Sequence, residues 1–291
     1  MRGLAWILGA ALCVPCAQAT EERPVINWMV AHWPPAMILK DGRAPQSAAD
    51  LGDGVVDRML AELVRRLPHY EHRFQLSTTR RTWHSMALGE PLCQASAFAS
   101  LERERLAYFT PSVLMPPVAL VVRRELAAQL SPQGAPVDLQ QLMERTDLQG
   151  RLESARSYGT QLDTLVGQQI AREPVSNIGQ MAQLVSKGRV DYTLEYAVTV
   201  EYWRRQGQLS QPLVALPLRV GGDWVVAQVA CTRSPWGREV IAAVDGAVRA
   251  AAATRSYRDL VFSWQLGPVS EADRQRVDQF FNERMQHVQV K

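Results

Sequence analysis

The chain has 291 residues, with 32 lysines and arginines, 29 aspartates and glutamates, and a formal net charge of +3. Hydrophobic residues make up 47% and charged residues 21%, which argues against disorder and predicts one large globular domain or two lobes. The small net charge, without a basic run interleaved with aromatic residues, argues against nucleic acid as a partner. Four cysteines are too few for a disulfide-built scaffold.

The first 19 residues have the features of an export signal. Arg2 gives a positive start, residues 4–14 form an apolar run, and Ala17-Gln18-Ala19 offers small residues for a signal peptidase. A membrane anchor is the alternative, but the run is shorter than the roughly 18–20 residues that span a bilayer. We therefore expect a cleaved signal peptide over residues 1–19 and a soluble mature protein outside the cytoplasm.

Two cysteines, Cys93 and Cys231, remain in the mature chain, because Cys13 and Cys16 fall within the expected signal. Two such cysteines in an oxidising compartment favour a disulfide bond. The sequence leaves open the alternative of two separate buried thiols.

Strands and helices are expected to alternate along the mature chain. In chain order, the apolar patterns predict a strand over 25–30, a helix over 55–67, strands over 72–76 and 92–98 with a short helix over 83–88 between them, a strand over 118–122, helices over 139–143, 162–170 and 178–185, strands over 190–196 and 224–230, a helix over 240–251, and another helix from residue 270. This alternation predicts an α/β fold with mostly parallel sheets flanked by helices.

Common catalytic motifs do not occur in the sequence. It contains no G-x-x-x-x-G-K-[ST] phosphate loop and no G-x-S-x-G nucleophile elbow. The five histidines, at positions 32, 69, 72, 84 and 287, have no metal-ligand spacing, so we expect no metal and no cofactor. A catalytic triad assembled from distant positions remains open.

The segment over residues 100–111, with the sequence SLERERLAYFTP, resembles one family. In periplasmic solute-binding proteins of the amino-acid-binding, bilobal type 2 class, a Ser or Thr precedes an acidic residue and an Arg, and a Phe-Ser/Thr-x-Pro-like strand leads toward the hinge. Similar motifs follow in the family's order: Trp33-Pro34-Pro35, Gly52-Asp53-Gly54, Ser157-Tyr158-Gly159-Thr160 and Gly188-Arg189-Val190-Asp191-Tyr192. Together they cover nearly all of the mature chain, which is similar to a divergent member of this class.

The resemblance implies a periplasmic-binding-protein-like fold of two α/β lobes, each a mostly parallel sheet flanked by helices, joined by two crossing strands. Lobe 1 would comprise residues 20–117 and 226–291, and lobe 2 residues 118–225. The crossings are expected near 118–122 and 224–229. Lobe 1 would then hold both Cys93 and Cys231, which makes a disulfide geometrically feasible. The family is usually monomeric.

The resemblance also assigns ligand contacts, which are Trp33, Phe98, Ser100 and Arg103 in lobe 1 and Tyr158, Gly159, Thr160 and Tyr196 in lobe 2. Arg103 matches the arginine that grips a ligand carboxylate, a role that suits the two parallel donors of a guanidinium. Ser100 would add a polar donor, and Trp33 an aromatic cover. The turn over 158–160 would offer free N–H groups at a helix start.

Each of these roles has a plainer alternative. Arg103 could be a surface charge, Trp33 could be a packing residue, and the turn over 158–160 could be an ordinary helix cap. We expect Arg80 and Arg81 to be a solvated pair of charges and not to line the cleft.

Some positions depart from the family pattern. Amino-acid binders hold the ligand's ammonium group with carboxylates, where this chain has Val30 and Tyr196, and Phe98 replaces a small polar residue. Glu195 adjoins Tyr196, but strand alternation is expected to turn it to the other face. An unpaired buried ammonium is costly. We therefore hypothesise that the ligand keeps a carboxylate and is not a standard α-amino acid.

The function favoured by the sequence is capture of a small polar or carboxylate-bearing ligand by lobe closure, for an ABC-type transporter in the inner membrane. The alternative is a ligand-presenting or partner-binding protein for a membrane sensor, with a degenerate cleft. Some proteins resembling the family are small-carboxylate dehydratases, but the sequence offers no clear acid/base pair, so we expect a protein that is not an enzyme.

Overall fold

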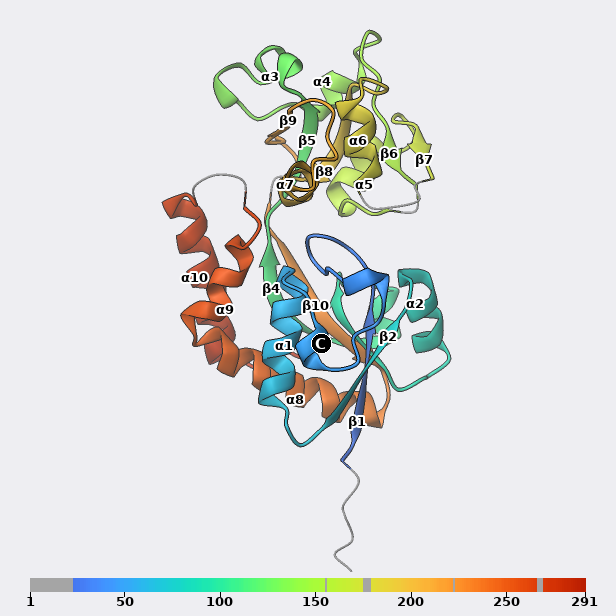
Figure 1. Cartoon of the computed structure of the whole chain (residues 1–291), viewed down its shortest axis with the longest axis vertical. Helices are drawn as coiled ribbons and strands as arrows, with labels where there is room; N and C mark the ends of the chain where they lie inside the picture. The colour runs from blue at the N-terminus through green and yellow to red at the C-terminus, as the bar shows by residue number, and fades with distance from the viewer. Residues whose placement is uncertain (1–22, 155, 175–178, 222, 266–268) are drawn as a thin grey trace, which may run out of the picture.

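The computed structural model describes residues 23–154, 156–174, 179–221, 223–265 and 269–291, so the expected signal over 1–19 lies outside the described residues. Figure 1 shows two lobes, one above the other, joined by a narrow waist. Within the described ranges, no helix is both long and apolar enough to cross a membrane.

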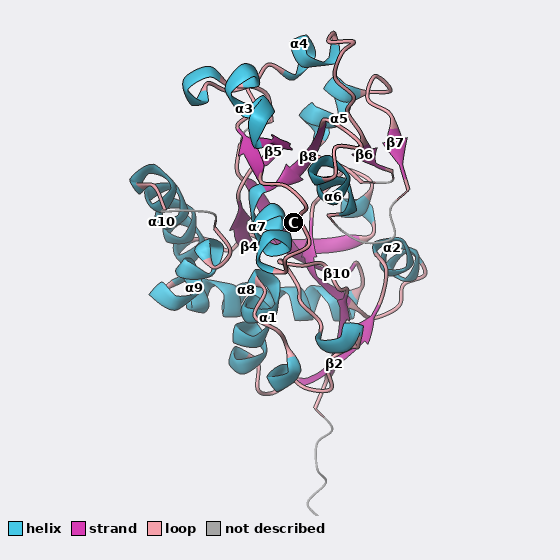
Figure 2. Ribbon diagram, turned by 45° about the horizontal axis from the view of Figure 1, so that its top comes forward, coloured by secondary structure: helices cyan, strands magenta, loops and turns pink. Residues whose placement is uncertain are grey.

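Lobe 1 contains a five-stranded sheet with helices on both of its faces. In spatial order its strands are β2 (Glu71–Leu76), β1 (Val25–Val30), β3 (Cys93–Ala97), β10 (Val225–Thr232) and β4 (Ala107–Met115). Its helices are α1 (Val55–Arg66), α2 (Thr79–Ala87), α8 (Pro235–Ala252), α9 (Arg255–Asp259) and α10 (Glu271–Gln286). Figures 1 and 2 place α8 and α10 on the far side from α2.

Alternate residues of the central strands enter two different cores. In β1, Trp28 packs into the larger core with the helices α1, α8 and α10, whereas its neighbour Met29 packs with Met86 of α2. Because both faces of the sheet are covered at its centre, the strands β1 and β10 are mostly apolar, whereas the edge strand β2 is mostly polar. Each large side chain removed from water in this way contributes about 1.5–3 kcal/mol to stability.

Lobe 2 is built around a smaller sheet. The strand β5 (Val118–Arg123) lies between β8 (Tyr192–Tyr196) and β9 (Leu213–Leu216), and a parallel pair, β6 (Leu152–Glu153) and β7 (Arg172–Glu173), extends the β8 side through a bridge from Gly150 to Tyr192. The helices are α3 (Arg124–Leu130), α4 (Leu139–Met143), α5 (Thr160–Val166), α6 (Gln180–Ser186) and α7 (Ala197–Arg205). A separate hydrophobic core fills this lobe.

The chain passes from lobe 1 to lobe 2 between β4 and β5, and it returns between β9 and β10. The crossings were expected near 118–122 and 224–229. The two connections lie directly before β5 and β10, which are interior strands of their sheets. Pro116 and Pro117 separate β4 from β5, because a residue without an N–H group cannot continue a ladder. The lobe limits stay our prediction.

The two-lobed α/β fold is present, but the sheets are mixed and not mostly parallel. The strand β10 runs antiparallel to β3 and β4, and β5 runs antiparallel to β8 and β9. The reason is the double crossing, because β4 leaves lobe 1 toward the waist and β10 returns from it.

The predicted disulfide between Cys93 and Cys231 is confirmed. The two residues lie opposite each other on the antiparallel strands β3 and β10, with their Cα atoms 4.1 Å apart. Both are fully buried in the larger core of lobe 1.

Candidate ligand-binding cleft

The predicted lobe 1 contacts lie at the edge of the sheet that faces lobe 2. The strands β1 and β3 are parallel, and β4 runs in the same direction because β3 and β4 are both antiparallel to β10. Since β4 leads to the crossing, the carboxyl ends of β1 and β3 point toward the waist. Trp33 follows β1, and Phe98, Ser100 and Arg103 follow β3, at the strand ends where open α/β sheets bind ligands.

The loop that carries Trp33 is anchored on the start of α1. The backbone groups of Trp33 and Met37 exchange two hydrogen bonds of 2.8 Å. Asp57 accepts the N–H of Ile38 at 2.6 Å and that of Gly54 at 3.2 Å, and burial raises the pKa of this carboxyl group although the donors act against it. Gly54 allows the close approach, because a Cβ there would lie 2.5 Å from the carbonyl oxygen of Ala36.

Arg103 lies in a single 3-10 turn, Arg103–Arg105, directly after β3. Its backbone N–H donates to Oγ of Ser100 at 3.3 Å, and its Nη1 donates to the carbonyl oxygen of Phe98 at 2.9 Å. Its Cζ lies 4.7 Å from the ring centroid of Trp83, a residue that the sequence analysis did not single out. Burial lowers the pKa of Arg103. Across the ranges that the structure describes, no ion pair includes Arg103.

The turn before α5 differs from the expectation of free N–H groups. The N–H of Tyr158 donates to Oδ1 of Asp163 at 3.0 Å, and the N–H of Gly159 donates to Oγ of Ser157 at 3.3 Å. A carboxylate of the chain itself therefore binds this turn. The φ of +99° at Gly159 favours glycine. Thr160 begins α5, which has only seven residues, and its side chain lies outside the described part of the chain.

Tyr158 is a core residue of lobe 2, with 5% of its surface exposed. Its hydroxyl accepts the N–H of Glu153 at 3.1 Å, and burial raises its pKa to about 12. Its ring packs against the guanidinium of Arg156, a side chain that the sequence analysis missed.

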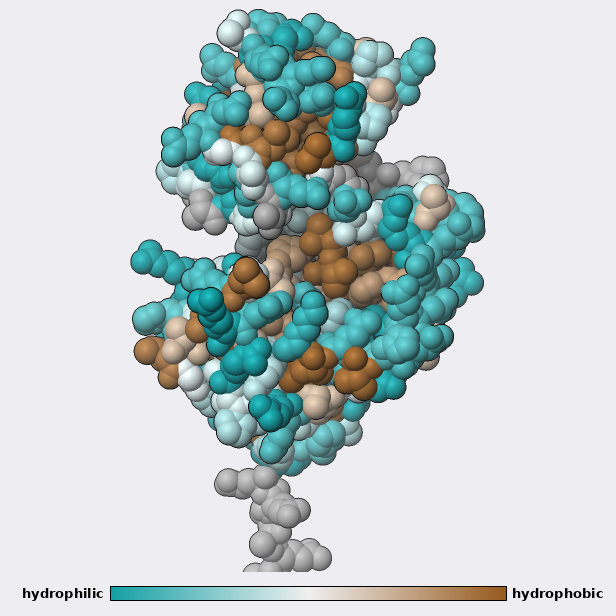
Figure 3. Space-filling model, turned by 180° about the vertical axis from the view of Figure 1, so that it is seen from behind, coloured by the Kyte–Doolittle hydropathy of each residue, from teal (hydrophilic) through white to brown (hydrophobic). Residues whose placement is uncertain are grey.

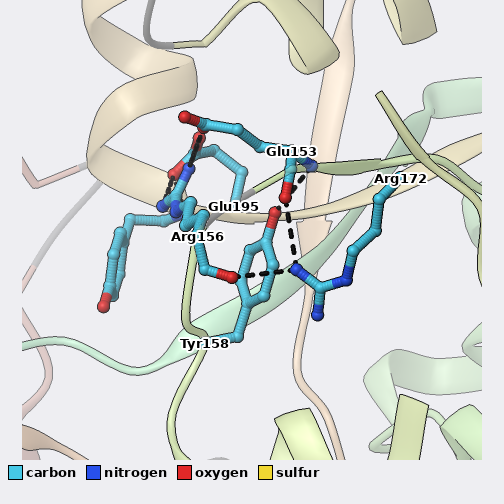
Figure 4. A network of polar contacts seen from close by, with 6 residues as sticks. Glu153, Arg156, Tyr158, Arg172 and Glu195 are labelled. Carbon is cyan, nitrogen blue, oxygen red and sulfur yellow. Dashed lines mark hydrogen bonds and ion pairs between the residues drawn. The ribbon is translucent and has the colours of Figure 1, made fainter. Parts of the chain in front are cut away.

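Arg156 forms a forked ion pair with Glu195 (Figure 4). Its Nη1 and Nη2 lie 2.7 Å from Oε2 and Oε1 of Glu195, and the two side chains are 6% and 2% exposed. Its Cζ lies 5.0 Å from the ring centroid of Tyr158 and 5.6 Å from that of Tyr196. Burial acts to lower the pKa of Arg156, but the charge and hydrogen bonds of Glu195 outweigh it, so the pKa is raised.

Two more side chains complete this cluster. Glu153 lies 3.5 Å from Nη1 of Arg156, and burial raises the pKa of its carboxyl group. Arg172 donates from Nη1 to the carbonyl oxygens of Glu153 and Arg156 at 3.2 and 2.9 Å (Figure 4). These bonds fix the backbone of the segment that presents Arg156.

The cluster lies at the end of lobe 2 next to the crossing. Glu195 and Tyr196 pair with Ala119 and Val118, the first residues of β5 after the chain enters this lobe. Strand alternation was expected to separate Glu195 from Tyr196, but Arg156 contacts both, because its long side chain reaches the carboxylate of one residue and the ring of the other. The contact between Arg156 and Glu195 could not be predicted from local sequence spacing, because the two residues are 39 positions apart in the chain.

The structure thus places two groups of predicted residues at facing edges of the two lobes. Figure 3, which shows the molecule from behind, displays a notch between the lobes with hydrophobic surface beside it on each lobe. Val30 is buried in the core of lobe 1, and Arg80 and Arg81 are exposed. Among the described residues, no group of three or more histidines, cysteines, aspartates or glutamates could hold a metal ion.

No protein-family model matches the sequence, and no curated protein matches it. Solved structures do match the fold. A histidine kinase sensor domain with similarity to periplasmic binding proteins superimposes with a TM-score of 0.62 at 18% identity, covering 85% of this chain and 99% of that chain. An ancestral arginine-binding protein bound to glutamine has a TM-score of 0.59 at 13% identity, covering 83% and 98%. A putative L-cystine ABC transporter protein from Listeria monocytogenes has a TM-score of 0.58 at 16% identity, covering 84% and 95%.

These similarities extend along almost the full length of each solved structure. The chain therefore has the two-lobed fold of the periplasmic binding proteins, which is the fold that the sequence resemblance implies.

Proposed function

We propose that this protein is a periplasmic solute-binding protein, a divergent member of the amino-acid-binding class. It captures a small carboxylate-bearing ligand between its lobes and delivers it to an ABC-type transporter in the inner membrane. It acts as a monomer, without a cofactor, and it does not turn its ligand over.

The observation that carries this proposal is that Arg103 has no ion-pair partner among the described residues. Charged side chains are seldom buried unless they are paired. The buried arginines Arg156 and Arg284 have carboxylate partners, whereas Arg103 is half-buried at the cleft edge and takes part in no ion pair of the described residues. Its Nη1 bonds to the carbonyl oxygen of Phe98, and its Nε and Nη2 remain for two oxygens of a carboxylate.

Two connections between rigid lobes suit capture by closure. Lobe 1 would supply the charge of Arg103 and the apolar side chains of Trp33 and Phe98. Lobe 2 would supply the ring of Tyr196, which packs against Arg156. A ligand bound first to Arg103 would then be enclosed when lobe 2 closes over it.

A sensory role is the second candidate. The half of the site in lobe 2 is filled by the chain's own ion pair between Arg156 and Glu195, which favours a cleft with limited room for a ligand. One structure of similar fold is a histidine kinase sensor domain. In this role the protein would present its ligand, or its closed form, to a membrane sensor.

The test is a thermal-melt screen of residues 20–291 against small mono- and dicarboxylates, followed by calorimetry on the compounds that respond. A ligand at about 100 times its dissociation constant adds roughly 2.7 kcal/mol of stability. We expect Arg103→Ala to weaken binding by about tenfold to a hundredfold, because charge-assisted hydrogen bonds contribute about 1.5–3 kcal/mol. Arg105→Ala, an exposed arginine of the same turn, is the matched control and should bind normally.

A response that is equal in Arg103→Ala and the control would contradict the assigned role of Arg103. No response to any carboxylate would overturn capture of a carboxylate-bearing solute and leave the sensory or partner-binding role. The compartment has its own test, since N-terminal sequencing of periplasmic protein should begin at about Thr20.

A further inference from the structure

We propose that Arg156 is a built-in substitute for the cationic group of a ligand. The cleft would then select carboxylates that carry no ammonium or guanidinium group. This inference rests on the proposed function and concerns the half of the same site that lies in lobe 2.

The first step concerns the carboxylate that could receive a ligand cation. Glu195 lies beside Tyr196 at the waist end of β8. Its Oε1 accepts hydrogen bonds from Nη2 of Arg156 and from the N–H of Tyr196, both at 2.7 Å. Its Oε2 accepts a hydrogen bond from Nη1 of Arg156, also at 2.7 Å. With 2% of the side chain exposed, a ligand ammonium could reach Glu195 only by displacing Arg156.

The second step concerns the aromatic rings. A cation gains from a position over the face of a tyrosine within about 6 Å of its centroid. The guanidinium of Arg156 takes that position over both Tyr158 and Tyr196. The two rings that the resemblance assigns to the ligand therefore already have a cation between them.

The third step concerns the remaining charges. Glu153, the other acidic side chain of the cluster, lies 3.5 Å from the same guanidinium. Arg172, which lies over the ring of Tyr158, forms an ion pair with Asp163 at 3.6 Å. Across the cleft, Arg103 lacks an ion-pair partner among the described residues. Each of the three acidic side chains named here, Glu195, Glu153 and Asp163, thus has an arginine partner within the chain. The unpaired charge among these described groups is that of Arg103, which attracts a carboxylate and repels an ammonium group.

The direct test compares compounds that differ by one amino group. Calorimetry on the unmodified protein would use succinate against L-aspartate, glutarate against L-glutamate, and propionate against L-alanine. We expect at least about a hundredfold preference for the member without the amine, because a buried, unpaired charged group is costly. Equal binding of both members, or a preference for the amine, overturns the inference and leaves the proposed function standing. If no carboxylate of any kind binds, the proposed function fails and the inference falls with it.

A second test examines the vacated site. Arg156→Ala leaves Glu195 beside a space of guanidinium size, so methylguanidinium at low millimolar concentration should raise the melting temperature of this variant. It should have no such effect on the unmodified protein or on the double variant Arg156→Ala/Glu195→Gln. Arg172→Ala is the matched control, because Arg172 also lies over Tyr158 but has no bond to Glu195, and it should not respond.

The two tests do not depend on each other. A folded Arg156→Ala variant that ignores methylguanidinium and keeps the original ligand preference overturns the inference. If that variant does not fold, the comparison of matched compounds still decides the question, because it needs no substitution.

Discussion

Replacing Arg284 with alanine should destabilise lobe 1 by about 3–5 kcal/mol, the cost of breaking a buried ion pair from one side. Arg284 lies on α10 and is fully buried, and its Nη2 is 2.7 Å from Oδ1 of Asp245 on α8, which is 2% exposed. It also donates to the carbonyl oxygens of Pro111 and His287 at 3.0 and 2.9 Å. The alanine variant would leave the carboxylate of Asp245 buried with neutral donors alone.

The size of this effect follows from the burial of the pair. An exposed pair on the same helix, Arg276 with Asp273 at 3.5 Å, should contribute less than about 1 kcal/mol, so Arg276→Ala is the matched control. Replacing both charges, as in Arg284→Met/Asp245→Leu, should recover much of the loss, because well-packed apolar residues can replace a buried pair at little cost.

The assay is urea unfolding at neutral pH, followed by tryptophan fluorescence and circular dichroism. The free energies of unfolding of Arg284→Ala, Arg276→Ala and the double variant would be compared with that of the unmodified protein. If Arg284→Ala loses no more stability than Arg276→Ala, the network does not hold α10 and α8 against β4, and the reasoning is wrong.

Two further predictions concern lobe 1. Replacing Cys93 and Cys231 with alanine, or reducing the disulfide, should lower the free energy of unfolding by about 3–5 kcal/mol, because the bond closes a long loop with a sequence separation of 138 residues; an unchanged denaturation midpoint would contradict this. Burial lowers the pKa of His72, whose Nδ1 accepts Nε1–H of Trp28 and whose Nε2 bonds to the carbonyl oxygen of Leu67. The contribution of His72 to the free energy of unfolding should therefore be fully present above the pKa of histidine in the unfolded chain, about 6.5. It should decline as the pH falls through the lower pKa that His72 has in the folded protein. Unfolding measured from pH 8 to pH 5 should show this decline, and His72→Gln should flatten it.

Much of the local structure could be read from the sequence, because apolar periodicity reports which face of an element is buried. The first strand was predicted over 25–30 and is β1 (Val25–Val30). The first helix was predicted over 55–67 and ends one residue earlier. The disulfide could be predicted because only two cysteines follow the expected signal. Trp33, Phe98, Ser100 and Arg103 were assigned by the family resemblance, and in the structure they follow the strands β1 and β3.

Other features depended on where the lobes and strands meet. The helix α7 (Ala197–Arg205) was not predicted, and α2 begins four residues before the expected position. The connections between the lobes directly precede β5 and β10, near the expected positions, but an apolar run by itself looks the same whether it adjoins a crossing or lies inside a sheet. The partner of an ion pair has no local signature either, so neither Arg156 with Glu195 nor Arg284 with Asp245 was anticipated.

The sequence by itself determined many of the strands and helices, because hydrophobic periodicity and prolines act over a few neighbouring residues. Only the tertiary structure decided that a guanidinium of the chain lies between Tyr158 and Tyr196 while that of Arg103 has no ion-pair partner among the described residues. The physical reason is that charge pairing depends on distance and burial in space, and folding brings together residues that the sequence keeps far apart.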